Sequence, residues 1–317
     1  MTITLGLPEK GISRSVNSHN SNLSVVCDWI EASVLFEDEA LSKTDVADVL
    51  LENEVYSNQD YALEFVDSAW NVLRTRTATL GGLLGPVLSG ERITRQTTWQ
   101  EFPAYAFCLA VSCGSYVYPN WARDHGYDYE AQGSLFERLT QQAVTSMLPG
   151  WNIRRVGWAP DNAVRLRDAL TDIIESLNEV ENAEAHTHVT AHAKELGLDI
   201  LAVYSFGDNH ASKPFIMIQC ASGKDWMDKR HTPDLKLWSK IINFNSAPLK
   251  GFAIPYSFTD AIDFRKEATS VDGVFLDRYR LLNPTAGATP VWTLESLNDD
   301  LLNWVSPRAT ALPRANA

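Results

Sequence analysis

The feature of the sequence that most constrains the fold is a pair of short apolar runs joined by a turn-rich loop. The runs are residues 199–206 (DILAVYSF) and 214–220 (PFIMIQC), and the loop between them contains Gly, Asp and Asn. Short runs rich in β-branched, aromatic and other apolar residues predict strands, and a loop of this composition predicts a hairpin. We therefore expect two antiparallel neighbouring strands.

The segments around this hairpin alternate between helical and strand patterns. In chain order we expect a capped amphipathic helix at 133–148, a strand at 151–158, then after the hairpin a helix at 234–244, a strand at 251–256, a helix at 259–268 and a strand at 273–281. An insert of about 40 residues, roughly 160–198, separates the first strand from the hairpin. The order α-β-(insert)-β-β-α-β predicts an α/β (α+β) fold, a mixed sheet flanked by helices.

The whole chain, at 317 residues, is long enough for two domains. Residues 45–76 place apolar side chains at steps of three and four, with an interruption near Ser57 and Asn58 where two helices are expected to meet. We expect a mainly helical amino-terminal domain at 1–130, the sheet domain at 131–285, and a carboxy-terminal helix with a flexible tail at 286–317.

The net charge of −13 is concentrated in the first part of the chain. Residues 21–70 hold twelve acidic residues and one basic residue, whereas residues 211–250 hold seven Lys or Arg and three Asp. The acidic segment is typical of a solvated helical face. It is also typical of a surface that docks a protein partner or a second copy of the chain, or of a surface that mimics DNA. The basic stretch keeps nucleic acid among the expected partners despite the overall negative charge.

Other features narrow the compartment and the chemistry. The chain has no run of about 18 apolar residues and no secretory leader pattern, so we expect a cytoplasmic protein without a membrane partner. Four cysteines without ligand spacing predict reduced, mostly buried thiols. His186, His188 and His192 invite a zinc assignment, but no further ligand follows at the required spacing, which favours a solvated or phosphate-facing loop.

Polar residues stand at the ends of the predicted elements. Asp199 opens the first strand of the hairpin and Gln219 lies near the end of the second, so antiparallel pairing would bring them side by side. Glu137 lies in the first turn of the preceding helix. Two carboxylates and an amide oxygen are hard ligands of the kind that Mg²⁺ or Mn²⁺ binds, and such an ion lowers the pKa of a bound water.

A lysine close to these residues would complete a hydrolytic site. Lys224 follows Gln219 after five residues and could hold the attacking water or a phosphate oxygen. Structural readings stay open for each residue. Asp199 can be a polar strand entrance, Gln219 a buried hydrogen-bonding amide, Glu137 a first-turn acid, and Lys224 a solvated surface lysine.

Three segments resemble the PD-(D/E)XK nuclease superfamily: LFERLTQQAVTSMLPGWNIRRVGW, GLDILAVYSF and FIMIQCASGK. They are closest to its Mrr-like restriction branch, in which a glutamine replaces the usual glutamate of the last motif. The resemblance covers about residues 133–256. It implies that Glu137, Asp199 and Gln219 bind the metal ion of an enzyme that hydrolyses DNA phosphodiester bonds, an effector of bacterial defence against foreign DNA.

The sequence departs from the family pattern at the lysine. The family places it two residues after the Glu or Gln, where this chain has Ala221, so Lys224 would have to serve from three residues further on. This departure favours an alternative from another class, a nuclease-like adaptor or nucleic-acid-binding subunit without catalysis. A nuclease directed at RNA would use the same residues.

Overall fold

The computed structural model describes residues 3–12, 21–80, 85–125, 128–157, 163–185, 187, 189, 196–283 and 295–315. It divides the chain into two compact units. The first unit comprises Met1–Gln132, Pro255–Asp263 and Arg278–Ala317, and the second comprises Gly133–Ile254 and Phe264–Asp277. The two units thus meet between Gln132 and Gly133, and the whole of Arg278–Ala317 belongs to the first. The three histidines considered for zinc lie outside the described residues.

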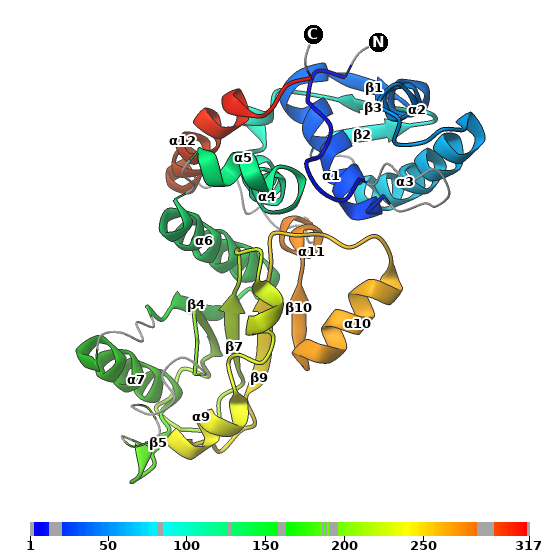
Figure 1. The fold of residues 1–317 in the computed structure, drawn as a ribbon. Coiled ribbons are helices and arrows are strands. Elements are labelled where there is room, and N and C mark those ends of the chain that lie inside the picture. Colours follow the sequence, from blue (N-terminus) through cyan, green and yellow to red (C-terminus); the bar gives the residue numbers. More distant parts are fainter. Residues whose placement is uncertain are drawn as a thin grey trace. The chain divides into compact units, whose positions relative to one another are not determined.

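Among the described residues, the second unit contains a five-stranded mixed sheet in the order β10-β9-β7-β6-β4 (Figure 1). Its strands are β4 (Trp151–Arg155), β6 (Ile200–Tyr204), β7 (Phe215–Cys220), β9 (Leu249–Ala253) and β10 (Val274–Leu276). The pairs β4·β6 and β6·β7 are antiparallel, and the pairs β7·β9 and β9·β10 are parallel. The expected hairpin and the α/β class are therefore confirmed.

Helices alternate with these strands in the expected order. They are α6 (Tyr129–Met147), α7 (Ala163–Leu177), α9 (Leu235–Ile241) and α10 (Ala261–Val271). The predicted strand at 273–281 is wrong in its second half, because β10 ends at Leu276 and α11 (Arg278–Leu282) follows. Arg278 and Tyr279 belong to the first unit, where they bury their side chains in a polar cluster.

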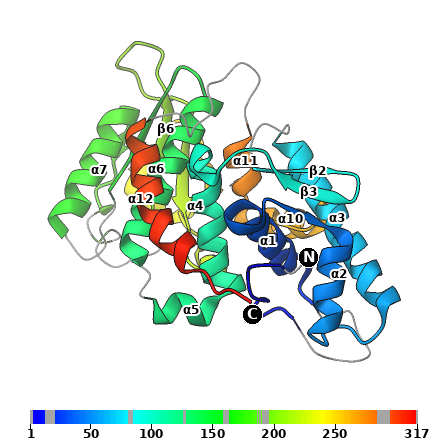
Figure 2. The ribbon, with the colours of Figure 1, turned by 90° about the horizontal axis from the view of Figure 1, so that it is seen from above.

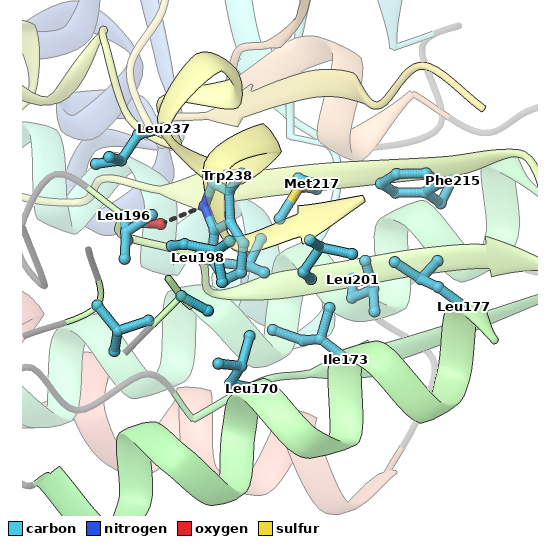
Figure 3. Packing of buried hydrophobic residues seen from close by; sticks show 14 of the residues in the cluster. Leu170, Ile173, Leu177, Leu196, Leu198, Leu201, Phe215, Met217, Leu237 and Trp238 are labelled. Atoms are coloured by element: carbon cyan, nitrogen blue, oxygen red, sulfur yellow. Dashed lines mark hydrogen bonds between the residues drawn. The ribbon is translucent and has the colours of Figure 1, made fainter. Parts of the chain in front are cut away.

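The core of the second unit lies between the sheet and the insert (Figure 3). Ile173 and Leu177 of α7 pack in one cluster with Leu201 of β6 and Met217 of β7. The period of α7 suits this role, since its apolar residues recur on one face while charged residues occupy the other. The short strands β5 (Val180–Glu181) and β8 (Ile242–Asn243) pair antiparallel and tie the insert to the end of α9. The insert is thus part of the folded core.

The first unit is mainly helical, as expected, and also contains a small sheet in the order β1-β3-β2 (Figure 1). Figure 2 shows β2 and β3 of this sheet from above. Its helices are α1 (Leu23–Ser33), α2 (Lys43–Glu52), α3 (Gln59–Thr79), α4 (Pro103–Ser112), α5 (Pro119–Asp124), α11 and α12 (Glu295–Ala311). Its strands are β1 (Ala40–Ser42), β2 (Pro86–Ser89) and β3 (Arg92–Arg95). Strands this short carry too little alternation to be read from sequence.

The described carboxy-terminal residues, 295–315, continue as a helix into the region where a flexible tail was expected. Helix α12 continues to Ala311 despite Pro307, and Trp304 packs edge-on against Phe107 of α4 with ring centroids 5.0 Å apart. Beyond the helix, Arg314 forms a β-bridge with Leu5. The four cysteines are free and buried, as expected. Among the described residues, no helix is long and apolar enough to cross a membrane.

A buried ionic cluster explains why the distant segments fold with the first unit. Arg76 of α3 lies 2.9 Å from an oxygen of Asp28 and 2.6 Å from one of Glu31, both on α1. Arg278 binds Asp28, and the Tyr279 hydroxyl donates to Glu31 at 2.7 Å. Opposite charges and hydrogen bonds satisfy one another here away from water. Two acids of the acidic segment are therefore internal and belong to no acidic surface.

Candidate active site

Strand pairing positions Asp199 and Gln219 at one end of the β6–β7 hairpin. The backbone N–H of Asp199 donates to the carbonyl of Ile218 at 3.0 Å, which continues the ladder by one residue and fixes the backbone of Asp199 beside Gln219. The Nε2 of Gln219 then donates directly to Asp199 Oδ2, across 20 positions of sequence. The backbone N–H of Cys220 donates to the same oxygen at 2.6 Å. The structure brings together the two residues that the sequence placed at the strand ends.

The amide of Gln219 is oriented by two further groups. Its Nε2 also donates to the carbonyl of Cys220 at 3.1 Å, and its Oε1 accepts from the hydroxyl of Thr232 at 3.2 Å. The nitrogen therefore faces Asp199 and the oxygen faces Thr232. This differs from the expected role of Gln219 as an oxygen ligand, because in this arrangement the amide acts as a hydrogen-bond donor to the carboxylate.

Glu137 reaches the same region from helix α6. Its side chain is 30% exposed, and Oε2 lies 3.7 Å from Nη1 of Arg155 at the end of β4. Partial burial raises the pKa of Glu137, while the charges of Arg155 and Lys229 lower it. Burial is the larger effect, so the carboxylate is incompletely compensated.

The electrostatics of Asp199 show the same deficit of positive charge. Burial raises its pKa from 3.8 to about 7, and the negative charge of Glu137 adds to this rise. The N–H of Cys220 and the charge of Lys229 act in the opposite direction. Two carboxylates that repel each other at a partly buried place form a site that a divalent cation would stabilise in the ionised form.

The lysine whose charge acts on both carboxylates is Lys229. It stands at the end of the 3-10 turn Trp226–Lys229, ten residues after Gln219. Lys224, five residues after Gln219, is exposed in the loop that follows β7. Ala221, at the position of the family's lysine, is buried. Sequence spacing did not identify Lys229, because its position near the two carboxylates depends on the turn Trp226–Lys229, which no sequence motif predicts.

Three contacts hold this turn in place within the second unit. Trp226 is buried, and its ring centroid lies 6.0 Å from that of Phe275 in β10. The carbonyl of Arg230 accepts a hydrogen bond from Lys250 Nζ of β9 at 2.6 Å. The guanidinium of Arg230 pairs with Glu267 of α10 at 2.6 Å. The turn is therefore fixed by apolar burial and by two buried or half-buried charged groups, and Lys229 and Thr232 take their places from it.

The donor set suits a hard cation held by few protein ligands. Among the residues that the structure describes, no group of three or more His, Cys, Asp or Glu side chains is arranged to bind a metal ion. No family model, curated protein or solved structure matches this chain. The pair Glu137 and Asp199 offers carboxylate oxygens, and Mg²⁺ is commonly bound through one or two carboxylates with waters and substrate phosphates completing the octahedron. The residues present thus fit Mg²⁺ or Mn²⁺.

Proposed function

We propose that the second unit is a metal-dependent nuclease that hydrolyses phosphodiester bonds in DNA. The observation that carries the proposal is the convergence at one sheet end of Asp199, held by Gln219 and the Cys220 N–H, with Glu137 close enough to raise its pKa. The three segments that resemble PD-(D/E)XK nucleases contain α6 with β4, then β6, and then β7 of one sheet, and this order of elements supports the proposal.

The residues of the chain divide the work between binding the ion and binding the phosphate. Glu137 and Asp199 would hold Mg²⁺ or Mn²⁺, which supplies Lewis-acid stabilisation and a bound water of lowered pKa. Gln219 holds the carboxylate of Asp199 in orientation. Lys229 carries a mobile positive charge beside both carboxylates, where it can attract a phosphate oxygen or orient a water.

The surroundings of the site suit a polyanionic substrate. Residues 211–250 carry seven Lys or Arg against three Asp, and they include the turn that bears Lys229. Among these residues, Lys229 is exposed and its charge acts on both carboxylates, so it would draw phosphate toward them even though the chain as a whole is acidic.

The decisive experiment is a cleavage assay with plasmid DNA in Mg²⁺ or Mn²⁺. Replacing Asp199 by Ala should abolish cleavage, and excess chelator should abolish cleavage by the wild type. Asp208→Ala is a matched control, because this exposed carboxylate lies in the loop of the same hairpin. Cleavage that survives in Asp199→Ala at the rate of the control would refute the assignment.

A second function is favoured by one observation. Ala221 occupies the family's lysine position and is buried, and the Gln219 amide presents nitrogen to Asp199. A nuclease-like subunit that binds nucleic acid or a larger complex without cutting would tolerate both features. DNA binding by wild type in Mg²⁺, measured together with absent cleavage and unchanged binding in Asp199→Ala, would favour this alternative.

A further inference from the structure

Thr232 lies at the point where the turn bearing Lys229 meets the candidate site. Its backbone N–H donates to the carbonyl of Lys229 at 2.9 Å, which closes the turn. Its hydroxyl lies 2.7 Å from that same carbonyl and 3.2 Å from Oε1 of Gln219. The side chain is half-buried. Thr232 therefore contacts Gln219 from the side opposite to Asp199.

The chemistry of these partners fixes the direction of each hydrogen bond. Both groups near the Thr232 hydroxyl are carbonyl oxygens, which only accept, so the hydroxyl must be the donor. On the other side of the amide, the carbonyl of Cys220 also only accepts, so it requires Nε2 of Gln219. A flipped amide would oppose Oε1 to the Cys220 carbonyl, so this carbonyl selects the observed orientation. In that orientation the Thr232 hydroxyl shares its one proton between the Lys229 carbonyl and Oε1 of Gln219, which adds to the preference.

That orientation determines which oxygen of Asp199 is accessible. The recorded hydrogen bonds to its side chain come from Gln219 Nε2 and the Cys220 N–H, and both end on Oδ2. Among the residues that the structure describes, none donates to Oδ1. Two donors on one oxygen stop rotation of the carboxylate and leave the other oxygen available as a ligand.

We propose that Thr232 is a positioning residue of the cation site. By donating to Gln219 it holds the amide as a donor to Asp199 Oδ2, and it thereby presents Oδ1 to the divalent cation. This inference rests on the proposed function, since it describes how the chain prepares one ligand of that cation.

Removing the hydroxyl should weaken cation binding without changing any ligand. Thr232→Val keeps the size of the side chain beside the Gln219 amide but removes the hydroxyl that donates to Oε1. The amide then also adopts the flipped orientation, and its hydrogen bond holds the Asp199 carboxylate for less of the time. We expect Mn²⁺ affinity to fall about fivefold, the factor equivalent to the roughly 1 kcal/mol of a net hydrogen bond. Thr232→Ser keeps the donor and should bind Mn²⁺ within twofold of the wild type.

The test uses two readouts on the full chain. The first is Mn²⁺ affinity from the electron paramagnetic resonance signal of the free ion. The second is the nitrogen–proton spectrum of side-chain amides in metal-free protein, in which the Gln219 signals are identified by their loss in Gln219→Met. Thermal unfolding of each variant checks folding, and Thr232→Ala replaces Thr232→Val if the valine does not fold.

Weaker Mn²⁺ binding and shifted Gln219 amide signals in Thr232→Val, both restored in Thr232→Ser, are the expected result. Equal Mn²⁺ affinity in wild type and Thr232→Val, or unchanged amide signals, would overturn the positioning role. Failure of the proposed function looks different. In that case the wild type itself binds no Mn²⁺ and the Asp199→Ala variant behaves as wild type in every assay.

Discussion

Arg278 donates two hydrogen bonds to Asp28, which lies 250 positions earlier in the chain. Nη1 is 3.1 Å from Oδ1 and Nη2 is 3.1 Å from Oδ2, in the interior of the first unit. The guanidinium has no exposed surface. Its two terminal nitrogens match the two oxygens of the carboxylate, and such a bidentate pair is stronger than a single hydrogen bond. Burial alone would raise the pKa of Asp28, yet Arg278 and Arg76 keep that pKa below its ordinary value.

Replacing Arg278 by Met should therefore destabilise the protein strongly. The change leaves the charges of Asp28 and Glu31 with Arg76 as their remaining cation, and loss of one partner from a buried ion pair costs about 3–5 kcal/mol. Urea unfolding followed by circular dichroism measures the change. Arg280→Met, on the exposed side of the same helix, is the control and should cost less than about 0.5 kcal/mol. Equal stabilities of the two variants would contradict a structural role of the cluster.

The insert should contribute to stability as a core element does. Ile173 of α7 is fully buried against the sheet, and its replacement by Ala removes apolar contacts and leaves a cavity at an expected cost of about 2–4 kcal/mol. Thr171→Ala, on the exposed face of the same helix, should be nearly neutral. Denaturant titration measures the free energy of unfolding of each variant. An unchanged free energy in Ile173→Ala would mean that α7 does not pack against the sheet.

The pH dependence of stability should report on Asp199 in metal-free protein. Its pKa is 3.8 when unfolded and about 7 when folded, so the folded state binds the proton more tightly. The stability that this proton provides is present in full below pH 3.8 and is lost as the pH rises to about 7. Wild type should therefore lose stability relative to Asp199→Asn over this interval, by up to roughly 1.4 kcal/mol per pH unit. Beyond pH 7 the difference should stay constant.

Urea unfolding at a series of pH values measures this difference. Asp208→Asn, an exposed carboxyl in the hairpin loop, is the matched control. Curves for wild type and Asp199→Asn that run parallel from pH 4 to 7 would show that Asp199 is not desolvated as the structure indicates.

The two lysines can be separated by their effect on cleavage. Lys229→Met removes the charge that acts on both carboxylates, so we expect kcat/KM for DNA cleavage to fall at least tenfold. Lys224→Met removes an exposed charge from the preceding loop and should change kcat/KM less than threefold. Initial rates at saturating Mg²⁺ provide the comparison. A larger effect of Lys224→Met would restore the lysine chosen from sequence spacing.

Local pattern was enough to predict the hairpin of the second unit and the order of its main helices and strands. The alternation and turn composition of residues 199–220 specified a hairpin, and antiparallel geometry then placed Asp199 beside Gln219. Neither step needs information from elsewhere in the chain, because strand propensity and hairpin turns depend on neighbouring residues.

The sequence by itself thus determined the α/β class, the order of the elements and the pairing of Asp199 with Gln219. Tertiary structure alone decided that the charge of Lys229 acts on both carboxylates, that Gln219 turns its nitrogen to Asp199, and that Arg278 folds with Asp28. Each of these depends on where a turn or a distant helix packs. Packing joins residues that are remote in sequence, and periodicity carries no record of such partners.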